Sequence, residues 1–285
     1  METIQLNGEE VVKNQNDNDC PQVLVDVASL VYAIPCSCVL SLEQLSKVTP
    51  LPTSPAEVRG VVNFRGKIIE LLDTRILFNS KSIVDEVREF SELMDCMKEA
   101  HLTWVHTLED SILTDKEFTL TTDPHQCAFG KWYDNYKTND SVLKFELAKF
   151  DNPHKAIHQL GIDAVEMQKK GNKEGASNLI NSTKATGLQQ MIGLFESIKE
   201  AYAKSRREIL VVLGETEQNA ISVSVDEIVA IEHIFEVDED LINNAGANTD
   251  YITGVAKRKN GSVIYILNDK FLLKTYSRVD SFIHK

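Results

Sequence analysis

The stretch that decides the fold runs from 58 to 78 and reads VRGVVNFRGKIIELLDTRILF. Short runs of β-branched and other apolar residues are broken by turn residues, a texture typical of strands. From about Ser82 the texture changes, because prolines almost disappear and apolar residues recur every third or fourth position. The stretch therefore marks the end of a β region and the start of a helical one.

The same strand-like texture lies before this stretch and returns near the end of the chain. The run VLVDVASLVYAIP begins at Val23, and a proline-bearing segment occupies 50–55. The texture resumes with ILVVL at Ile209. Further on, Asn260-Gly261 lies between two apolar runs, which is a strong hairpin signal. Both ends of the chain are thus expected to be β.

The block between them, from about 82 to 207, has helical periodicity. Its first part predicts one long amphipathic helix, in which the apolar positions are Val84, Val87, Met94, Met97, Trp104 and Leu108. A short segment around 129–132 and a helix over 142–150 follow. We expect a further helix to be capped by Asp151, with Pro153 at its first position. Four or so helices, packed antiparallel as a bundle, are predicted.

Length and composition favour two units. The 285 residues exceed what one core usually supports. Removing a helical insertion of about 120 residues leaves roughly 165, a fair size for one domain. No apolar run approaches the roughly 20 residues that span a bilayer. A net charge of −13 disfavours nucleic acid and favours a protein partner or small ligand. The polar arm 1–21 does not resemble a secretory signal, so a cytoplasmic setting is expected.

Three patterns in the helical block carry potential metal ligands. His101 lies three residues before Trp104, so both share one side of the first helix. Cys127 opens the sequence CAFGKW. His154 and His158 are four apart on a helix, about 5–6 Å between Cβ atoms, which suits two bonds to one ion. Three nitrogens and one sulfur match tetrahedral Zn²⁺, whereas copper and iron usually prefer other geometries.

Each pattern also has an ordinary explanation. The five cysteines (Cys20, Cys36, Cys38, Cys96 and Cys127) are odd in number and irregularly spaced, which argues against disulfides and for thiols that pack or bind metal. An H-x-x-x-H pattern is commonly two exposed histidines, and tryptophans commonly pack in cores. His125 could replace a ligand, whereas His106 points away from the face of His101. Four protein ligands leave no position for an activated water, which favours a structural or sensory role.

The patterns H-x-x-W, C-x-F-G-K-W and H-x-x-x-H, in this order, resemble the chemoreceptor zinc-binding (CZB) domain family. This resemblance covers 85–204 and implies a four-helix bundle that binds Zn²⁺ through His101, Cys127, His154 and His158. It also implies cytoplasmic sensing of zinc or of oxidants such as hypochlorous acid. Because a zinc-bound thiolate stays oxidisable where it can be reached, Cys127 is a candidate switch.

The flanking β segments resemble the CheW-like domain. The residues that carry this resemblance are YAIP at 32–35, VRGVVNFRG at 58–66, LLD at 71–73 and ISVSVDEIV at 221–229. The resemblance implies two halves, 22–84 and 205–285, of a fold made of two small five-stranded β-barrels. It further implies a scaffold that ties chemoreceptors to the histidine kinase CheA without catalysing a reaction.

Within this resemblance, Asn63, Arg65 and Gly66 carry over as partner-binding residues, with Arg65 the best candidate for an interface contact. The ordinary alternative for Arg65 is a solvated charge at a turn. The chain departs from the family pattern at Glu70, where proline is usual, at Thr74, where leucine is usual, and at Ala220, where glycine is usual. These departures put full retention of kinase binding in doubt.

The sequence thus predicts a noncatalytic chemotaxis adaptor with a zinc-binding helical insertion. A metalloenzyme is one alternative, but it would need an open coordination position and a nearby base. A structural zinc clip without a sensing role is another. No nucleotide-binding loop, G-x-S-x-G motif or kinase signature is present. A homodimer through the helical bundle is a further possibility.

Overall fold

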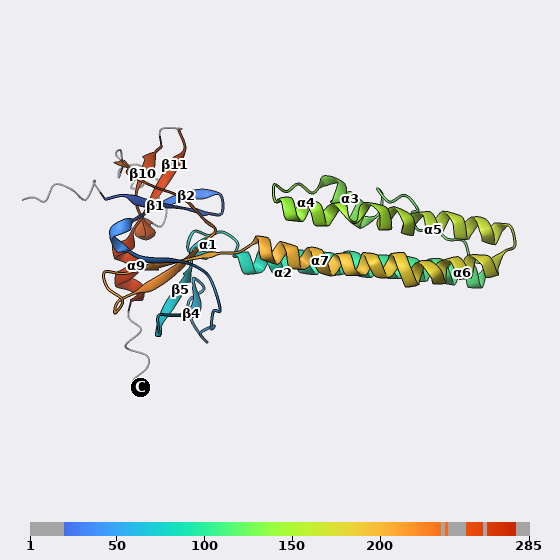
Figure 1. Ribbon diagram of the computed structural model, residues 1–285, viewed down its shortest axis with the longest axis horizontal. Coiled ribbons are helices and arrows are strands. Elements are labelled where there is room, and N and C mark those ends of the chain that lie inside the picture. The colour runs from blue at the N-terminus through green and yellow to red at the C-terminus, as the bar shows by residue number, and fades with distance from the viewer. Residues whose placement is uncertain (1–19, 235–236, 239–248, 259–260, 278–285) are drawn as a thin grey trace, which may run out of the picture. The chain divides into compact units, whose positions relative to one another are not determined.

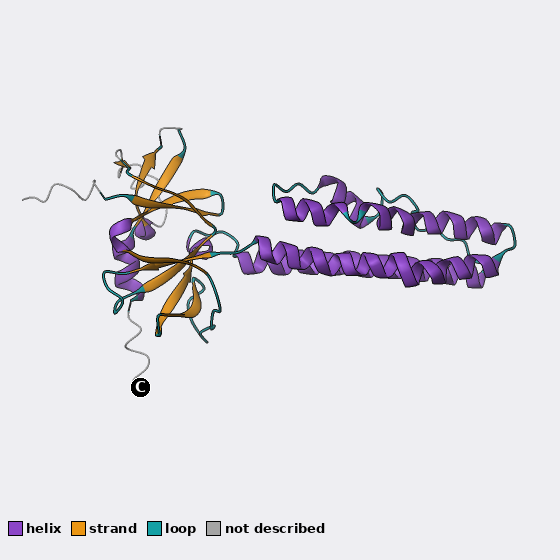
Figure 2. Ribbon diagram, in the orientation of Figure 1, coloured by secondary structure: helices purple, strands orange, loops and turns teal. Residues whose placement is uncertain are grey.

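The computed structural model describes residues 20–234, 237–238, 249–258 and 261–277. The chain divides into two compact units, Ile83–Arg206 and the remainder, Met1–Ser82 with Arg207–Lys285. We call Ile83–Arg206 the helical unit and the remainder the β unit. Figure 2 shows the long helices in the helical unit and the strands in the β unit. Most of the predicted N-terminal arm lies outside the described residues. Within the described ranges, no helix is long and apolar enough to cross a bilayer.

The first sheet of the β unit has six strands in the order β8-β1-β2-β11-β10-β9. Figure 1 labels four of them, β1, β2, β10 and β11. Two antiparallel hairpins, β1–β2 and β10–β11, are joined because β11 pairs parallel with β2. The predicted hairpin near Gly261 is therefore confirmed as a strand pair, although Asn260 lies outside the described residues. The strands are β1 (Gln22–Val27), β2 (Leu30–Pro35), β8 (Glu227–Glu232), β9 (Val237–Asp238), β10 (Ile252–Lys257) and β11 (Val263–Leu267).

The second sheet has five strands in the order β3-β6-β7-β5-β4. Here too a parallel pair, β5 with β7, joins segments that are distant in the sequence. Residues on both sides of the helical block therefore build one sheet. The strands are β3 (Val39–Gln44), β4 (Val58–Phe64), β5 (Lys67–Asp73), β6 (Ile209–Leu213) and β7 (Ile221–Val225).

The prediction of two closed five-stranded barrels is wrong, because within the described residues neither sheet closes on itself. Closure requires the two edge strands of a sheet to pair. At the edge of the second sheet, Thr49 exchanges two backbone hydrogen bonds with Val61 of β4, at 2.9 and 2.8 Å. Pro50 and Pro52 follow, and prolines have no N–H to donate. The pairing therefore ends after one bridge.

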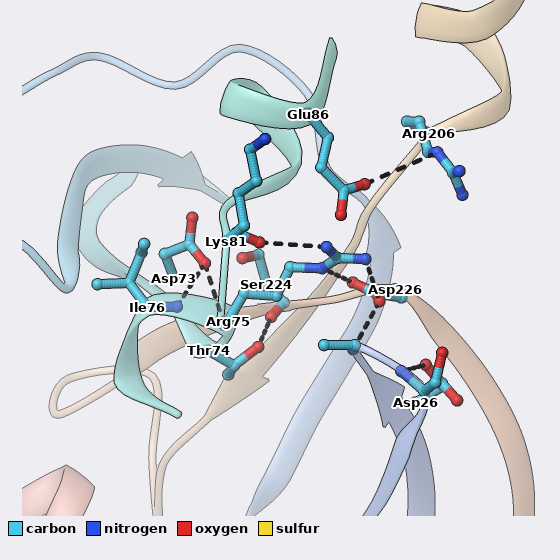
Figure 3. Close-up of polar contacts among 12 residues, drawn as sticks. Asp26, Asp73, Thr74, Arg75, Ile76, Lys81, Glu86, Arg206, Ser224 and Asp226 are labelled. Atoms are coloured by element: carbon cyan, nitrogen blue, oxygen red, sulfur yellow. Dashed lines mark hydrogen bonds and ion pairs between the residues drawn. The ribbon is translucent and has the colours of Figure 1, made fainter. Parts of the chain in front are cut away.

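Side-chain caps and a buried ion pair set the local structure where β5 ends. The apolar run after Asp73 becomes a short helix, α1 (Thr74–Leu77), because the Asp73 carboxylate accepts hydrogen bonds from the next turn. Arg75 forms a fork with Asp226, with Nε–Oδ1 and Nη2–Oδ2 distances of 2.8 and 2.6 Å (Figure 3). The same carboxylate accepts the backbone N–H of Ala28 at 2.8 Å. This pair thus ties α1 to the turn between β1 and β2.

The core of the β unit is shared by both sheets. Tyr32 and Val25 from the first sheet pack in one cluster with Leu72 and Val223 from the second. The final helix, α9 (Asp269–Tyr276), was not predicted; it buries Leu272 and Tyr276 in the same cluster. Burial of this apolar surface is the main force that holds the two sheets together.

The helical unit is built around long helices. Helix α2 packs along α7, and α5 packs against α6 and α2. A π-helical turn, Lys184–Leu188, connects α6 to α7 without a break. The antiparallel four-helix bundle is not confirmed, because α3 and α4 have only eight residues each. The helices are α2 (Ile83–Thr114), α3 (Ala128–Asn135), α4 (Ser141–Ala148), α5 (Asp151–Lys169), α6 (Lys173–Thr183) and α7 (Gln189–Ser205).

A ladder of ion pairs accompanies the antiparallel packing of α2 against the segment 184–206, which contains α7. Along the ladder, residue numbers rise on α2 and fall on this segment. Its rungs are Glu86–Arg206 at 3.9 Å, Asp95–Lys199 at 2.8 Å, Lys98–Glu196 at 2.8 Å and Glu109–Lys184 at 2.8 Å. Figure 3 includes the first of these rungs.

The predicted cap at Asp151 is wrong. Helix α5 already begins at Asp151, and its N-cap is Phe150, whose side chain makes no capping hydrogen bond. The reason is that Lys149 and Phe150 already have helical backbone angles, so α4 and α5 are almost continuous. Asp151 instead lies in the first turn, where its carboxylate pairs with Lys155 at 2.9 Å. Pro153 occupies the third helical position rather than the first.

Candidate metal centre

Four side chains from three parts of the helical unit meet at one point. His101 comes from α2, Cys127 immediately precedes α3, and His154 and His158 lie one turn apart on α5. One ligand atom from each lies within 4.8 Å of all the others. The three histidines are buried and the cysteine is half-buried. The structure therefore brings together all four residues that the sequence singled out.

His101 is held with one nitrogen free for a ligand. Its Nδ1 lies 2.8 Å from the carbonyl oxygen of Met97. Because a carbonyl can only accept, Nδ1 carries the proton and Nε2 keeps its lone pair. Nε2 points into the cluster, 4.0 Å from Sγ of Cys127. A histidine that donates its outer N–H to a carbonyl is the usual arrangement behind a metal-binding imidazole.

Cys127 is the N-cap residue of α3. Its Sγ accepts the backbone N–H of Gly130 at 3.1 Å and lies 3.2 Å from Nε2 of His154. Burial raises the pKa of the Cys127 thiol, while the N–H groups of Gly130 and Phe129 oppose that rise. A cation at the cluster would favour the thiolate further.

A steric constraint explains why position 130, in the pattern C-x-F-G-K-W, is a glycine. A Cβ at Gly130 would lie 1.8 Å from the carbonyl oxygen of Pro124. The loop before Cys127 can therefore close onto the first turn of α3 only when this position lacks a side chain. That closure aims Sγ at the histidines.

His158 is the least satisfied residue of the cluster. It is 1% exposed, and neither ring nitrogen makes a well-formed hydrogen bond among the described residues, although the backbone of Thr121 lies close enough to raise the pKa of His158 against the effect of burial. Leaving a buried polar group unpaired costs about 1–3 kcal/mol, so such a group calls for an explanation. A cation bound by the ring supplies one.

The charge state of the histidines suits a cation. Burial, followed by the neighbouring imidazoles, lowers the pKa of His154 to about 3. Burial and then His101 lower the pKa of His158 to about 4. Burial also lowers the pKa of His101. All three rings are therefore neutral near pH 7, which metal binding requires. Three neutral imidazoles and one thiol fit a zinc site.

A shell of aromatic rings surrounds the cluster. The ring centroid of Phe129 lies 4.9 Å from that of His154, and Phe195 of α7 lies 6.1 Å from His101. Trp104 packs 5.2 Å from His158, and its Nε1–H donates to the carbonyl of Thr121 at 2.9 Å. Sequence reasoning missed Phe195, because one apolar residue on a periodic helix face looks like any other.

The two other candidate histidines of the helical unit stay outside the cluster. The side chain of His125 is 60% exposed, and its Nδ1 pairs with Asp134 at 2.9 Å. His106, as predicted, points away: its side chain is 72% exposed and pairs with Asp110 at 3.2 Å. His125 therefore does not replace a member of the cluster.

The predicted partner-binding residues lie at the turn between β4 and β5. Arg65 and Gly66 have φ angles of 50° and 86°, the left-handed conformation of a tight hairpin turn. Oδ1 of Asn63 accepts the N–H of Gly66 at 2.8 Å. Arg65 lies over the Phe64 ring at 4.9 Å and pairs with Glu217 at 2.9 Å. The turn is exposed and its side chains contact one another and Glu217, and its role in binding stays a prediction.

Comparison with protein families bears on both units. Residues 101–165 match the chemoreceptor zinc-binding domain, and residues 22–94 match the CheW-like domain. The predicted resemblance to both families is confirmed. The CZB match begins at His101 and contains the whole cluster. The CheW-like match continues into α2, and neither match extends past residue 165.

No curated protein matches the chain. Among solved structures, the scaffolding protein TtCheW from Thermoanaerobacter tengcongensis is similar at 11% sequence identity. The alignment covers 87% of this chain and 88% of that one, with a TM-score of 0.38.

Proposed function

We propose that this protein is a noncatalytic chemotaxis adaptor that binds zinc. In this proposal, 22–84 and 205–285 form a CheW-like domain that binds chemoreceptors and the kinase CheA in the cytoplasm. Residues 85–204 form an inserted CZB domain, and 1–21 a polar arm. The observation that carries the proposal is the convergence of four donor atoms within 4.8 Å, inside a segment that matches a zinc-binding family.

His101, Cys127, His154 and His158 would hold the ion. Zinc would supply a positive charge that keeps the Cys127 thiol deprotonated at neutral pH. Four protein donors complete a tetrahedral shell, which supports a structural or sensory role over hydrolysis. A metalloenzyme would instead require one of these four side chains to leave its place.

Cys127 is the residue proposed to respond to oxidants, because it is half-buried while the histidines are buried. Hypochlorous acid would take two electrons from the thiolate sulfur, so that a sulfenic acid forms and chloride leaves. A sulfenic acid is a poorer ligand than a thiolate. Its formation would release α3 from α2 and α5, and α2 and α7 continue directly into the β unit. This is the proposed route from oxidant to partner binding.

Metal analysis of the purified full chain tests the zinc site. We expect close to one zinc per chain in the wild type and a large loss in Cys127→Ala and His158→Leu. His125→Gln is the matched control, since this histidine lies two residues from Cys127 and outside the cluster, and it should keep its zinc. Sub-stoichiometric zinc in the wild type after growth in zinc would overturn the proposal. If His101→Ala abolished a hydrolytic activity of the wild type, the metalloenzyme reading would replace it.

Binding assays test the adaptor role separately. Chemoreceptor cytoplasmic fragments and CheA should bind the zinc-loaded chain, and Arg65→Glu should weaken that binding. Zinc-loaded and hypochlorous-acid-treated protein should differ in affinity. Equal affinities would leave a structural zinc clip in an adaptor without sensing. Sedimentation of the loaded chain tests the proposed homodimer.

A further inference from the structure

The β unit contains a second site that neither family resemblance assigns. It is a pocket of about 380 Å³, within the range of about 300–1,000 Å³ found for small-ligand pockets. Four aromatic side chains and one carboxylate dominate its wall. We call it the tyrosine pocket, and its defining residues are Tyr32, Glu57, Phe78, Tyr251 and Tyr265.

The aromatic wall is rigid. Tyr32 is 5% exposed and stacks on Phe78 with ring centroids 4.2 Å apart and planes within 6°. Tyr265 leans against Tyr32 at 5.5 Å. Faces of aromatic rings carry partial negative charge and attract cations placed over them. Tyr32 is covered by its neighbours, whereas Phe78, Tyr251 and Tyr265 are partly exposed and provide the aromatic surface for a flat cationic group.

The carboxylate of Glu57 is fixed by a chain of hydroxyl groups. Tyr276 donates its hydroxyl to Oε1 of Glu57 at 3.0 Å, and the hydroxyl of Tyr251 lies 3.2 Å from that of Tyr276. Burial, then Tyr251 and Glu57, raise the pKa of Tyr276, so its hydroxyl stays a donor. The carbonyl of Glu57 also accepts the N–H of Asp73 at 2.8 Å. Side chain and backbone are both anchored.

The second carboxylate oxygen of Glu57 is available. Across the described residues, no lysine, arginine or histidine pairs with Glu57, and the pocket wall contains no cationic side chain. The pocket therefore combines aromatic faces with one anchored negative charge for which the described part of the chain supplies no positive partner. Its complement is a planar cation that can stack and donate hydrogen bonds at once.

We propose that the tyrosine pocket binds the guanidinium group of an arginine side chain on a partner polypeptide. Guanidinium is planar, weakly hydrated and able to stack on rings while its N–H groups reach a carboxylate. A lysine ammonium is a compact, strongly hydrated charge and fits less well. Free arginine would bring an α-carboxylate that finds no cation in the wall, so a side chain on a neutral peptide backbone is favoured.

Calorimetric titration of the full chain with a blocked tripeptide, alanine–arginine–alanine, tests the site. We expect saturable binding that weakens about tenfold or more when citrulline, the uncharged isostere, replaces arginine, because a charge-assisted hydrogen bond is lost. The peptide with lysine in place of arginine should bind more weakly than the arginine peptide. Free arginine should bind more weakly than the blocked arginine peptide and the blocked lysine peptide. Zinc-loaded and zinc-free protein should bind equally, which separates this site from the metal centre.

Two variants locate the binding. Glu57→Gln removes the charge and keeps an oxygen for the Tyr276 hydroxyl, and it should weaken the arginine peptide about tenfold. Tyr265→Leu removes a ring and should also weaken it. Glu215→Gln, an exposed glutamate of the same unit, is the control and should change nothing. Equal affinity for the citrulline peptide, or wild-type affinity in Glu57→Gln with an unchanged melting temperature, would overturn the proposal.

Discussion

Both units bury polar side chains, but they satisfy them in opposite ways. In the β unit, Arg75 and Asp226 are paired through two hydrogen bonds, and a backbone N–H completes the carboxylate. In the helical unit, His158 is buried with both ring nitrogens unpaired among the described residues. The first arrangement is complete within the chain, whereas in the second the described residues leave a buried ring without a well-formed hydrogen bond. The contrast distinguishes a polar group that stabilises the fold from one that is suited to bind a ligand.

Zinc removal gives the largest expected effect. Ligand binding stabilises a folded state by about 4 kcal/mol when free zinc is 1,000 times its Kd. Chelation should therefore lower the melting transition of the helical unit and leave that of the β unit in place. Differential scanning calorimetry of the full chain, with and without a chelator, measures this. If the chelator left the melting transition of the helical unit unchanged, the stability of this unit would not depend on zinc, and the two units would not differ in this respect.

Arg75→Ala should destabilise the β unit by about 3 kcal/mol, because Asp226 would lose its buried partner. The side chains of Arg75 and Asp226 are 10% and 18% exposed, so water replaces little of the lost interaction. Both tryptophans, Trp104 and Trp132, lie in the helical unit, so tryptophan fluorescence would not report on this change. Urea unfolding followed by hydrogen exchange of the backbone amides of the β unit measures it. Arg65→Ala, in the same unit, is the control: its side chain is 60% exposed, and the loss should stay within about 0.5 kcal/mol. A similarly small loss for Arg75 would contradict the role given to the pair.

Acid should weaken the metal-free helical unit specifically. Above pH 6.5, the histidine pKa without burial, His154 and His158 are neutral in both folded and unfolded chains. Below it, the unfolded chain takes up protons that the folded chain refuses until about pH 4 for His158 and 3 for His154. Stability should fall by about 1.4 kcal/mol per pH unit for each histidine. Helicity against denaturant at pH 7 and 5 tests the sign, and a flat profile would refute it.

The smallest expected effect has opposite signs in two conditions. In metal-free protein, His158→Leu removes two unpaired buried nitrogens and should stabilise the helical unit by about 1 kcal/mol. With zinc present, the same variant loses a ligand and should be less stable than the wild type. His101→Leu is the comparison, because it breaks a hydrogen bond to Met97 and should not stabilise the metal-free form. If His158→Leu instead destabilised the metal-free protein, the unpaired nitrogens of His158 would not carry the cost assigned to them.

The members of the cluster were predictable because each rests on local spacing. His154 and His158 share a helix face whenever the helix forms. Gly130, three residues after Cys127, is the residue type expected where the backbone packs closely against the preceding loop. The type of each region was predictable for the same reason: periodicity is local. The β texture on both sides of the helical block therefore indicated one β unit.

What could not be predicted depends on contacts between distant segments. Nothing near Arg65 in the sequence indicates Glu217, and nothing near Arg75 indicates Asp226. At the edge of the second sheet, the pairing of Thr49 with β4 ends at Pro50, and the sequence of β4 alone does not indicate where this pairing begins or ends. The cap assigned to Asp151 failed for a local reason, because Lys149 and Phe150 already have helical backbone angles.

The ion-pair ladder between α2 and α7 restricts how these helices can move. If α7 slid along α2 by three residues, about 4.5 Å at a rise of about 1.5 Å per residue, Lys98 would come opposite Lys199, and sliding the other way would bring Asp95 opposite Glu196. Either displacement replaces attraction with repulsion. Sliding of α7 along α2 is thus disfavoured in both directions. A twist or bend of the two helices together keeps every ion pair and is therefore the easier deformation.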